Sequence, residues 1–210
     1  MSRVLGIDEA GRGCVLGDLC VGAFFVEDPD DSVLREAGAD DSKRLSKKRR
    51  DAAREALSSL GEATVVRISP SEIDQGNLNQ LEISAIAGLV RRFKPDRVYM
   101  DALGPTKTVP KLIARLQQRV GDGCTPEWII EPKADHTYPI VGAASIFAKT
   151  TRDRALAELD DAHGPLGSGY PSDPKTKAWL RSWAASPHPW PPFVRTRWQT
   201  IQDLGQRKLL

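Results

Sequence analysis

A mixed α/β domain followed by a small helical appendage is the fold class that the sequence predicts. Two apolar segments of strand character, 3–8 and 18–27, flank a glycine-rich turn at 9–17, which is the pattern of a β-hairpin. Strand-like and helix-like patterns then alternate as far as about His163, as they do in α/β domains. Beyond Gly164 the composition changes. We therefore predict an α/β domain at 1–163 and an appendage at 164–210.

Five strands are predicted, because β-branched and aromatic residues recur in these segments without helical spacing. The segments are 3–8, 18–27, 63–69, 97–103 and 127–131. The first two form the hairpin, and the other three alternate with helices. The predicted sheet is therefore a mixed one.

Four helices are predicted between and after these strands, from apolar residues spaced three and four apart. Ser46 is the expected N-cap of a helix that ends at Gly61. Pro70 opens one long helix that Pro95 closes, and two further helices cover 111–120 and 138–162. The first half of the last helix is nearly all apolar, so it is expected to be buried.

The appendage differs from the rest of the chain in composition and charge. It holds seven of the 15 prolines, four of the five tryptophans and a net charge of +5, although the whole chain carries only +2. Asp173 followed by Pro174 is a typical helix start, and Trp179 and Trp183 share one helix face at a spacing of four. A small, basic, helical unit is expected.

Length and composition exclude several classes of protein. The 210 residues, 40% of them hydrophobic and 28% charged, are enough for a buried core. Three cysteines without a C-x-x-C pair argue against a disulfide framework or a zinc knuckle. No segment approaches the ~18 apolar residues of a membrane span, and the N-terminus does not resemble a secretion signal. A cytoplasmic protein without a membrane partner is expected.

Basic residues gather in a second place, the segment 43–50, which contains six of them. Lysines and arginines at a helix start oppose the helix dipole, so stability does not explain them. Lys43, Lys47 and Lys48, together with free backbone amides, predict a site for a nucleic-acid backbone. A solvated basic helix face is the alternative interpretation.

Acidic residues at the ends of buried strands are the main candidates for chemistry. Asp8 and Glu9 close the first apolar run, Asp101 follows Val98–Met100, and Asp135 lies shortly after Trp128–Ile130. In α/β sheets such strand ends meet at one edge, where four carboxylates would repel one another unless hard cations compensate. This pattern favours two Mg²⁺ ions acting on a phosphodiester. For any single acid, a role in a cap, a turn or the surface is the alternative.

The glycine-rich turn is a weak match to a dinucleotide-binding loop, because a strand follows it instead of a helix. Gly11 and Gly13 permit backbone amides to approach a sugar or phosphate, and Arg12 supplies a cation; a strained hairpin turn is the alternative. Tyr170, held between glycine and proline near the basic appendage, either stacks on a nucleotide or fills the appendage core. His136, beside Asp135, is the one histidine placed for acid–base work.

Five motifs give the chain a resemblance to the type 2 ribonucleases H, the ribonuclease HII family. They are GIDEAGRG at 6–13, DSKRLS at 41–46, Asp101, KADHTYPIVGAASIFAKTTRDR at 133–154 and GSGYPSDPKT at 167–176. With PPFVRTRW at 191–198, the last motif looks closer to the archaeal and eukaryotic catalytic-subunit style than to the usual bacterial one.

The resemblance implies a ribonuclease H-like fold, a five-stranded mixed sheet flanked by helices, and a monomeric endonuclease. It implies hydrolysis of the RNA strand of RNA/DNA hybrids and nicking of duplex DNA at embedded ribonucleotides, leaving a 3′-hydroxyl and a 5′-phosphate. It implies two Mg²⁺ or Mn²⁺ ions per site. The implied metal ligands and catalytic residues are Asp8, Glu9, Asp101 and Asp135. The implied substrate contacts are Gly11, Arg12 and Gly13 at the ribose 2′-hydroxyl, Tyr170 at the RNA–DNA junction and Lys43 at a phosphate.

Two positions depart from the family pattern, since Cys14 and Asp18 stand where proline is common. Cys14 is expected to loosen the turn, and Asp18 to add negative charge near the metals. Gln206 and Leu209 have the spacing of a sliding-clamp peptide, but no aromatic pair follows them. Two other functions remain open: a carboxylate-type 3′–5′ exonuclease and a non-catalytic hybrid-binding module.

Overall fold

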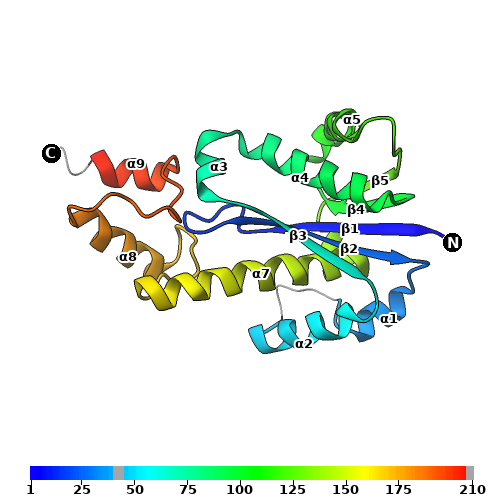
Figure 1. Cartoon of the computed structure of the whole chain (residues 1–210), viewed down its shortest axis with the longest axis horizontal. Coiled ribbons are helices and arrows are strands. Elements are labelled where there is room, and N and C mark those ends of the chain that lie inside the picture. The colour runs from blue at the N-terminus through cyan, green and yellow to red at the C-terminus, as the bar shows by residue number, and fades with distance from the viewer. Residues whose placement is uncertain (40–44, 207–210) are drawn as a thin grey trace.

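The computed structural model describes residues 1–39 and 45–206 as a five-stranded sheet between two helical layers, with two further helices beyond one end of the sheet (Figure 1). The strands are β1 (Arg3–Ala10), β2 (Leu19–Glu27), β3 (Glu62–Ile68), β4 (Arg97–Asp101) and β5 (Glu127–Glu131). Their order is β3-β2-β1-β4-β5; β2 is antiparallel to β1 and β3, whereas β4 is parallel to β1 and β5. The predicted fold class is therefore confirmed.

The helices follow the strands in the expected alternation. They are α1 (Asp31–Glu36), α2 (Lys47–Ser58), α3 (Pro70–Gln75), α4 (Leu78–Phe93), the 3₁₀ turn η1 (Thr106–Thr108), α5 (Val109–Val120), α6 (Ala134–Thr137), α7 (Pro139–His163), α8 (Pro174–Ala185) and α9 (Gln199–Gln206). In the part of the chain that the structure describes, no helix is long and apolar enough to cross a membrane.

One face of the sheet is covered by α3, α4 and α5. Leu5 and Ile7 of β1 point to this face and pack in one apolar cluster with Ile83 and Ile86 of α4. The cluster extends to Leu116 of α5. It is the larger part of the core, and it fixes the position of α4 beneath the end of β1.

The opposite face is covered by α7, with α1 and α2 outside it (Figure 1). The approach of α7 is unusually close: a Cβ atom on Gly6 would lie 2.1 Å from the Ile140 carbonyl oxygen, and one on Gly22 would lie 2.5 Å from that of Ala144. Only glycine fits at these two strand positions. The close contact sets the position of the first two turns of α7 relative to β1 and β2.

Some local predictions differ from the structure. The helix expected over 70–94 is two helices, because Gly76 is extended and the Asn77 side chain caps a new helix by accepting a hydrogen bond from Gln80 N (3.2 Å). The first strand continues through Ala10 instead of ending at Asp8. Helix α1, capped by Asp30, was not expected.

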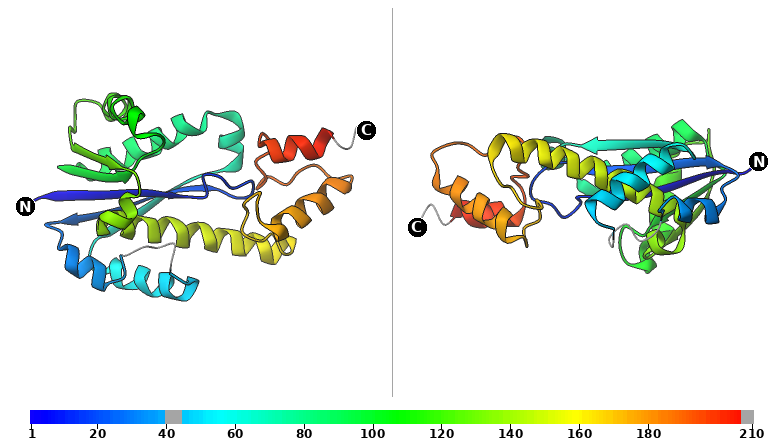
Figure 2. Two further views of the ribbon diagram at one scale, coloured as in Figure 1. Left: turned by 180° about the vertical axis from the view of Figure 1, so that it is seen from behind. Right: turned by 90° about the horizontal axis from the view of Figure 1, so that it is seen from below.

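The appendage packs against the α/β domain around a third apolar cluster (Figure 2). Leu166, Leu180 and Phe193 of the appendage contribute to it, and so do Leu16 of the glycine-rich turn and Leu156 of α7. As predicted, Asp173 caps α8 and Trp179 and Trp183 share one helix face; their rings stack with centroids 5.2 Å apart. The turn therefore lies between the two parts of the molecule.

Candidate active site

A cavity of about 410 Å³ opens at the carboxyl end of β1 and β4, where the turn, α2, α7 and Tyr170 meet. Its lining residues are Asp8, Glu9, Ala10, Gly11, Arg12, Gly13, Arg50, Asp101, Lys149, Arg152, Asp153 and Tyr170. Asp8, Glu9 and Asp101 lie on the sheet side, and the basic residues of α2 and α7 lie on the other side together with Asp153. This arrangement suits a phosphate-containing ligand that binds together with cations.

Asp8 and Glu9 both reach the cavity, although they are consecutive residues of a strand and point to opposite faces of the sheet. Both can do so because β4 stops pairing with β1 at Ile7, so β1 has no neighbour on that side at Asp8 and Glu9. The cavity wraps around the unpaired edge and is lined by both carboxylates.

Asp101, the last residue of β4, lines the same cavity. Its Oδ1 atom accepts hydrogen bonds from the backbone N–H groups of Ala102 (2.9 Å) and Lys133 (2.8 Å). Asp135 is buried on α6 and is not a lining residue, but its charge acts on Asp8, and its Oδ1 lies 3.8 Å from Nε2 of His136. Three predicted acids thus line the cavity and the fourth lies beside it.

Burial makes ionisation of the first two acids costly. Desolvation raises the pKa of Asp8, and a hydrogen bond from Ser145 and the positive charge of Lys149 offset this only in part. Desolvation, followed by the charge of Asp8, raises the pKa of Glu9 to about 7. Both carboxyls would be stabilised as carboxylates by a cation placed between them.

The donor set fits Mg²⁺ or Mn²⁺, which prefer carboxylate oxygen. Within residues 1–39 and 45–206, no three acidic, histidine or cysteine side chains converge into a closed metal cage. Mg²⁺ does not require one, because it is commonly held by one or two carboxylates, water and substrate phosphates. The open row of acids along the cavity matches that mode of binding.

The basic wall of the cavity consists of Arg50 of α2 with Lys149 and Arg152 of α7. Asp153 holds the two arginines in place, because its carboxylate accepts from Arg50 Nη2 (2.9 Å) and from Arg152 Nη1 (2.8 Å). Sequence reasoning did not single out these three cations. The sequence feature that could have indicated two of them is the spacing of Lys149 and Arg152, which lie three residues apart on a helix whose preceding half is buried.

The glycine-rich turn and Tyr170 form the remaining wall. Gly11 has a φ of +86° and permits the reversal of the chain, and Gly13 faces the ring of Tyr170. Tyr170 is 37% exposed, and its ring stacks over the guanidinium of Arg152 at 5.1 Å. The guanidinium of Arg12 is directed to Glu82 and Asn79 of α4. Lys43, the remaining predicted substrate contact, lies outside the described residues.

Arg195 anchors this turn from the appendage. Its fully buried side chain donates hydrogen bonds to the carbonyl oxygens of Gly17 (2.9 Å) and Arg12 (3.0 Å). Burial lowers the pKa of Arg195 to about 10, so the side chain remains charged at neutral pH. The position of the turn therefore depends on both parts of the molecule.

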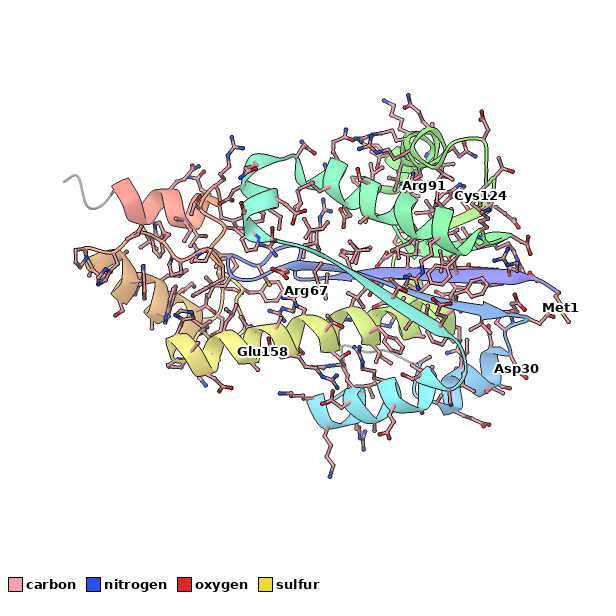
Figure 3. All side chains as sticks on the ribbon, in the orientation of Figure 1. Met1, Asp30, Arg67, Arg91, Cys124 and Glu158 are labelled. Atoms are coloured by element: carbon pink, nitrogen blue, oxygen red, sulfur yellow. The ribbon has the colours of Figure 1, made fainter. Side chains whose placement is uncertain are left out.

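The two departures from the family pattern have local explanations. Asp18 accepts a hydrogen bond from Arg67 Nε (2.7 Å), which compensates its charge; Figure 3 shows Arg67 at the end of the sheet nearest the appendage. Cys14 is buried beneath the turn, and its sulfur lies 3.3 Å from Arg152 Nη2. Desolvation raises the pKa of the Cys14 thiol, so it is neutral.

Comparison with known proteins agrees with this geometry. The family model described as "Ribonuclease HII" matches residues 5–201. The chain belongs to the ribonuclease HII family. A ribonuclease HII of Archaeoglobus fulgidus is 38% identical over 208 residues, which cover 97% of each chain. The crystal structure of ribonuclease H2 from Pyrococcus horikoshii is 36% identical, with a TM-score of 0.88 over 98% of each chain.

Two further solved structures have titles that name a partner or a metal. The structure of a PCNA:RNase HII complex from Archaeoglobus fulgidus has a TM-score of 0.84 at 35% identity, covering 95% of this chain and 96% of that one. A Bst-RNase HIII in complex with Mn²⁺ has a TM-score of 0.78 at 15% identity, covering 98% of this chain and 70% of that one, and shows the fold alone. Family membership makes the chain a type 2 ribonuclease H, an endonuclease acting on RNA/DNA hybrids.

Proposed function

We propose that the protein uses this cavity to cut the RNA strand of RNA/DNA hybrids and to nick duplex DNA at embedded ribonucleotides. The observation that carries the proposal is the cavity itself, with Asp8, Glu9 and Asp101 on one wall and Arg50, Lys149 and Arg152 on the other. A phosphodiester between the walls meets metal ligands on one side and cations on the other. Cleavage leaves a 3′-hydroxyl and a 5′-phosphate.

The carboxylates of Asp8, Glu9, Asp101 and Asp135 would hold two Mg²⁺ or Mn²⁺ ions. Bound divalent cations supply an activated water and neutralise the leaving 3′-oxygen. The backbone hydrogen bonds of Asp101 fix its carboxylate at the strand end. Arg50, Lys149 and Arg152 bind the phosphates and hold the scissile group near the acids.

The turn and Tyr170 select the substrate. Gly11 and Gly13 allow backbone groups to approach the ribose 2′-hydroxyl, which is the group that separates RNA from DNA. Arg12 shapes the turn from its position against α4. Tyr170 lies opposite Gly13 and stacks on the sugar that follows the ribonucleotide. Lys43 contributes one further phosphate contact.

Magnesium-dependent cleavage of a duplex that contains one ribonucleotide tests the proposal. We expect one nick per site, a 5′-phosphate on the downstream product, and no reaction in EDTA. A closed circular duplex with one ribonucleotide distinguishes an endonuclease from a 3′–5′ exonuclease, because only the former opens it. Binding without cleavage in either metal would leave a hybrid-binding module.

Asp8→Asn should reduce kcat by at least roughly 10³-fold and leave hybrid binding largely intact, because it removes a metal ligand without touching the basic wall. Asp122→Asn is the matched control, since Asp122 is exposed in a distant loop. Cleavage by the Asp8 variant at the rate of the control would contradict the metal assignment.

A sliding clamp is a further proposed partner, supported by the PCNA complex of the Archaeoglobus relative. Leu209, which with Gln206 has the spacing of the first two clamp-peptide anchors, belongs to residues 207–210, which lie outside the described residues. Co-elution of the full chain with purified PCNA, compared with a Gln206→Ala, Leu209→Ala variant, tests the proposal. Equal co-elution of the parent and the variant would show that PCNA binds elsewhere on the surface.

A further inference from the structure

A glutamate on the inner face of α4 has no role in the site described so far. Glu82 is 0% exposed and is flanked on α4 by the core residues Ile83 and Ile86. It lies in a narrow gap beneath β1, beside Glu9 and Asp101. Burying a carboxylate in apolar surroundings is costly, so its partners are informative.

Arg12 of the turn supplies the compensating charge. Its Nη1 atom donates to Glu82 Oε2, and its Nη2 atom donates to Asn79 Oδ1 (2.5 Å). Two side chains three residues apart on α4 thus hold two nitrogens of one guanidinium. The Arg12 side chain retains 30% exposure, whereas Oε1 of Glu82 is buried with no hydrogen-bond partner among the described residues.

Stability does not explain this arrangement. A buried ion pair is often no more stabilising than apolar residues of the same volume, and here one carboxylate oxygen stays unsatisfied. Glu82 also adds negative charge beside acids that already repel one another. Its distinctive effect is geometric: it ties the side chain of the middle residue of Gly11–Gly13 to a helix anchored in the core.

We propose that Glu82 is a positioning residue. It acts through Arg12 to hold the Gly11–Gly13 turn in the position from which its backbone contacts the ribose 2′-hydroxyl. The contact of the turn with the 2′-hydroxyl rests on the function proposed above. The restraint of the turn by Glu82 does not depend on that function. Arg195 fixes the carbonyl side of the same turn, and Glu82 fixes the side chain. Without Glu82 the Arg12 side chain would keep only its hydrogen bond to Asn79.

Glu82→Gln is the primary variant, because the amide has the shape of the carboxylate and removes only the charge. Glu62→Gln is the matched control: Glu62 accepts a hydrogen bond from Arg92 (2.6 Å) in an ion pair that is more than half exposed on both sides. Arg12→Met and the double variant Arg12→Met, Glu82→Gln complete a double-mutant cycle. The double variant leaves no unpaired charge, so it remains foldable.

Hydrogen exchange at the amides of residues 11–17 measures the hold on the turn directly. We expect roughly tenfold faster exchange in Glu82→Gln than in the parent or in Glu62→Gln, at an unchanged melting temperature. On a duplex with one ribonucleotide, kcat should fall roughly tenfold with KM nearly unchanged, because the phosphate contacts are intact. In the Arg12→Met background the Glu82 substitution should add no further loss.

Parent-like exchange in Glu82→Gln would overturn the proposal, and so would a loss of kcat that adds in full to that of Arg12→Met. Faster exchange in Glu82→Gln than in the parent, together with a parent that does not cleave the ribonucleotide duplex, would uphold the hold on the turn and refute the proposed function. The two failures are therefore distinguishable.

Discussion

At the scale of single residues, the acids were predictable and their cationic neighbours were not. Asp8, Glu9 and Asp101 each follow an apolar run, and a charged residue at a buried strand end rarely lies there without a partner. Lys149 and Arg152 occupy a helix on which basic residues are ordinarily solvated. Only the packing of α7 against the sheet turns them into the cavity.

The ionisation of Glu9 gives the metal-free protein a characteristic pH dependence. Desolvation raises its pKa from 4.5 to about 7, so between these values the folded protein keeps a proton that the unfolded chain releases. The free energy of unfolding therefore decreases as the pH rises from 4.5 to about 7 and levels off above that. Glu9→Gln should flatten this decrease, leaving the contribution of Asp8.

Melting temperatures in EDTA across this pH range measure the effect, with Glu62→Gln as the exposed control. Added Mg²⁺ should raise the melting temperature more at about pH 8 than at about pH 5, because the ligands must be deprotonated to bind it. A Glu9→Gln protein with the parental pH slope would show that Glu9 ionises as freely in the folded state as in the unfolded chain.

Tyr170 has a different consequence, which depends on the substrate. Tyr170→Ala should lose roughly ten- to a hundredfold activity on a single embedded ribonucleotide, from about 1–3 kcal/mol of stacking. The loss on a long RNA/DNA hybrid should be far smaller, since many registers are productive there. Tyr170→Phe keeps the ring over Arg152 and should behave like the parent.

Initial rates on the two substrates, measured side by side, check the prediction. Equal losses for Tyr170→Ala on both would assign the ring to general binding or to the fold. Its contact with the guanidinium of Arg152 would then be the more important role.

At the scale of elements, hydrophobic spacing predicted most helices and all five strands. It did not predict that a single polar residue can end one helix and start another. The apolar stripe is compatible with one helix from Ile73 to Phe93, yet Asn77 caps a new helix after the extended Gly76. As a result of this break, α4 begins beside the turn and presents Asn79 and Glu82 to Arg12.

The contact between α7 and β1 is the contact between elements that tolerates added side-chain volume least. Gly6→Ala would place a methyl group 2.1 Å from the Ile140 carbonyl oxygen, so α7 must move away from the sheet. We expect a loss of about 1–3 kcal/mol or more in the free energy of unfolding. Because Ser145 and Lys149 would move away from Asp8, kcat should fall as well.

Gly123→Ala is the matched control, because nothing lies within 4 Å of a Cβ atom there. It should be neutral or slightly stabilising. Urea unfolding of the two variants checks the prediction. Equal midpoints would mean that α7 can shift along the sheet without cost.

At the scale of the whole molecule, the glycine-rich turn contacts both the α/β domain and the appendage. The composition change at Gly164 coincides with the end of α7 at His163, but the appendage core includes Val15 and Leu16. Sequence pattern could not show this, because contacts between residues so far apart in the chain depend on the tertiary fold. The turn therefore contacts both parts of the molecule, and we expect its order to depend on the docked appendage.

Arg195 makes this dependence testable. Arg195→Met removes a buried cation and leaves the carbonyl oxygens of Arg12 and Gly17 without their donor, at a cost of about 1–3 kcal/mol for each buried group. Arg195→Lys keeps the charge but cannot reach both carbonyls, so it should recover only part of the stability. Since these carbonyls belong to the turn, both variants should lose activity at temperatures where they remain folded.

Thermal unfolding and cleavage of a single-ribonucleotide duplex, measured on the same samples, separate the two effects. Parental activity in a destabilised Arg195→Met protein would show that the turn holds its shape without the appendage.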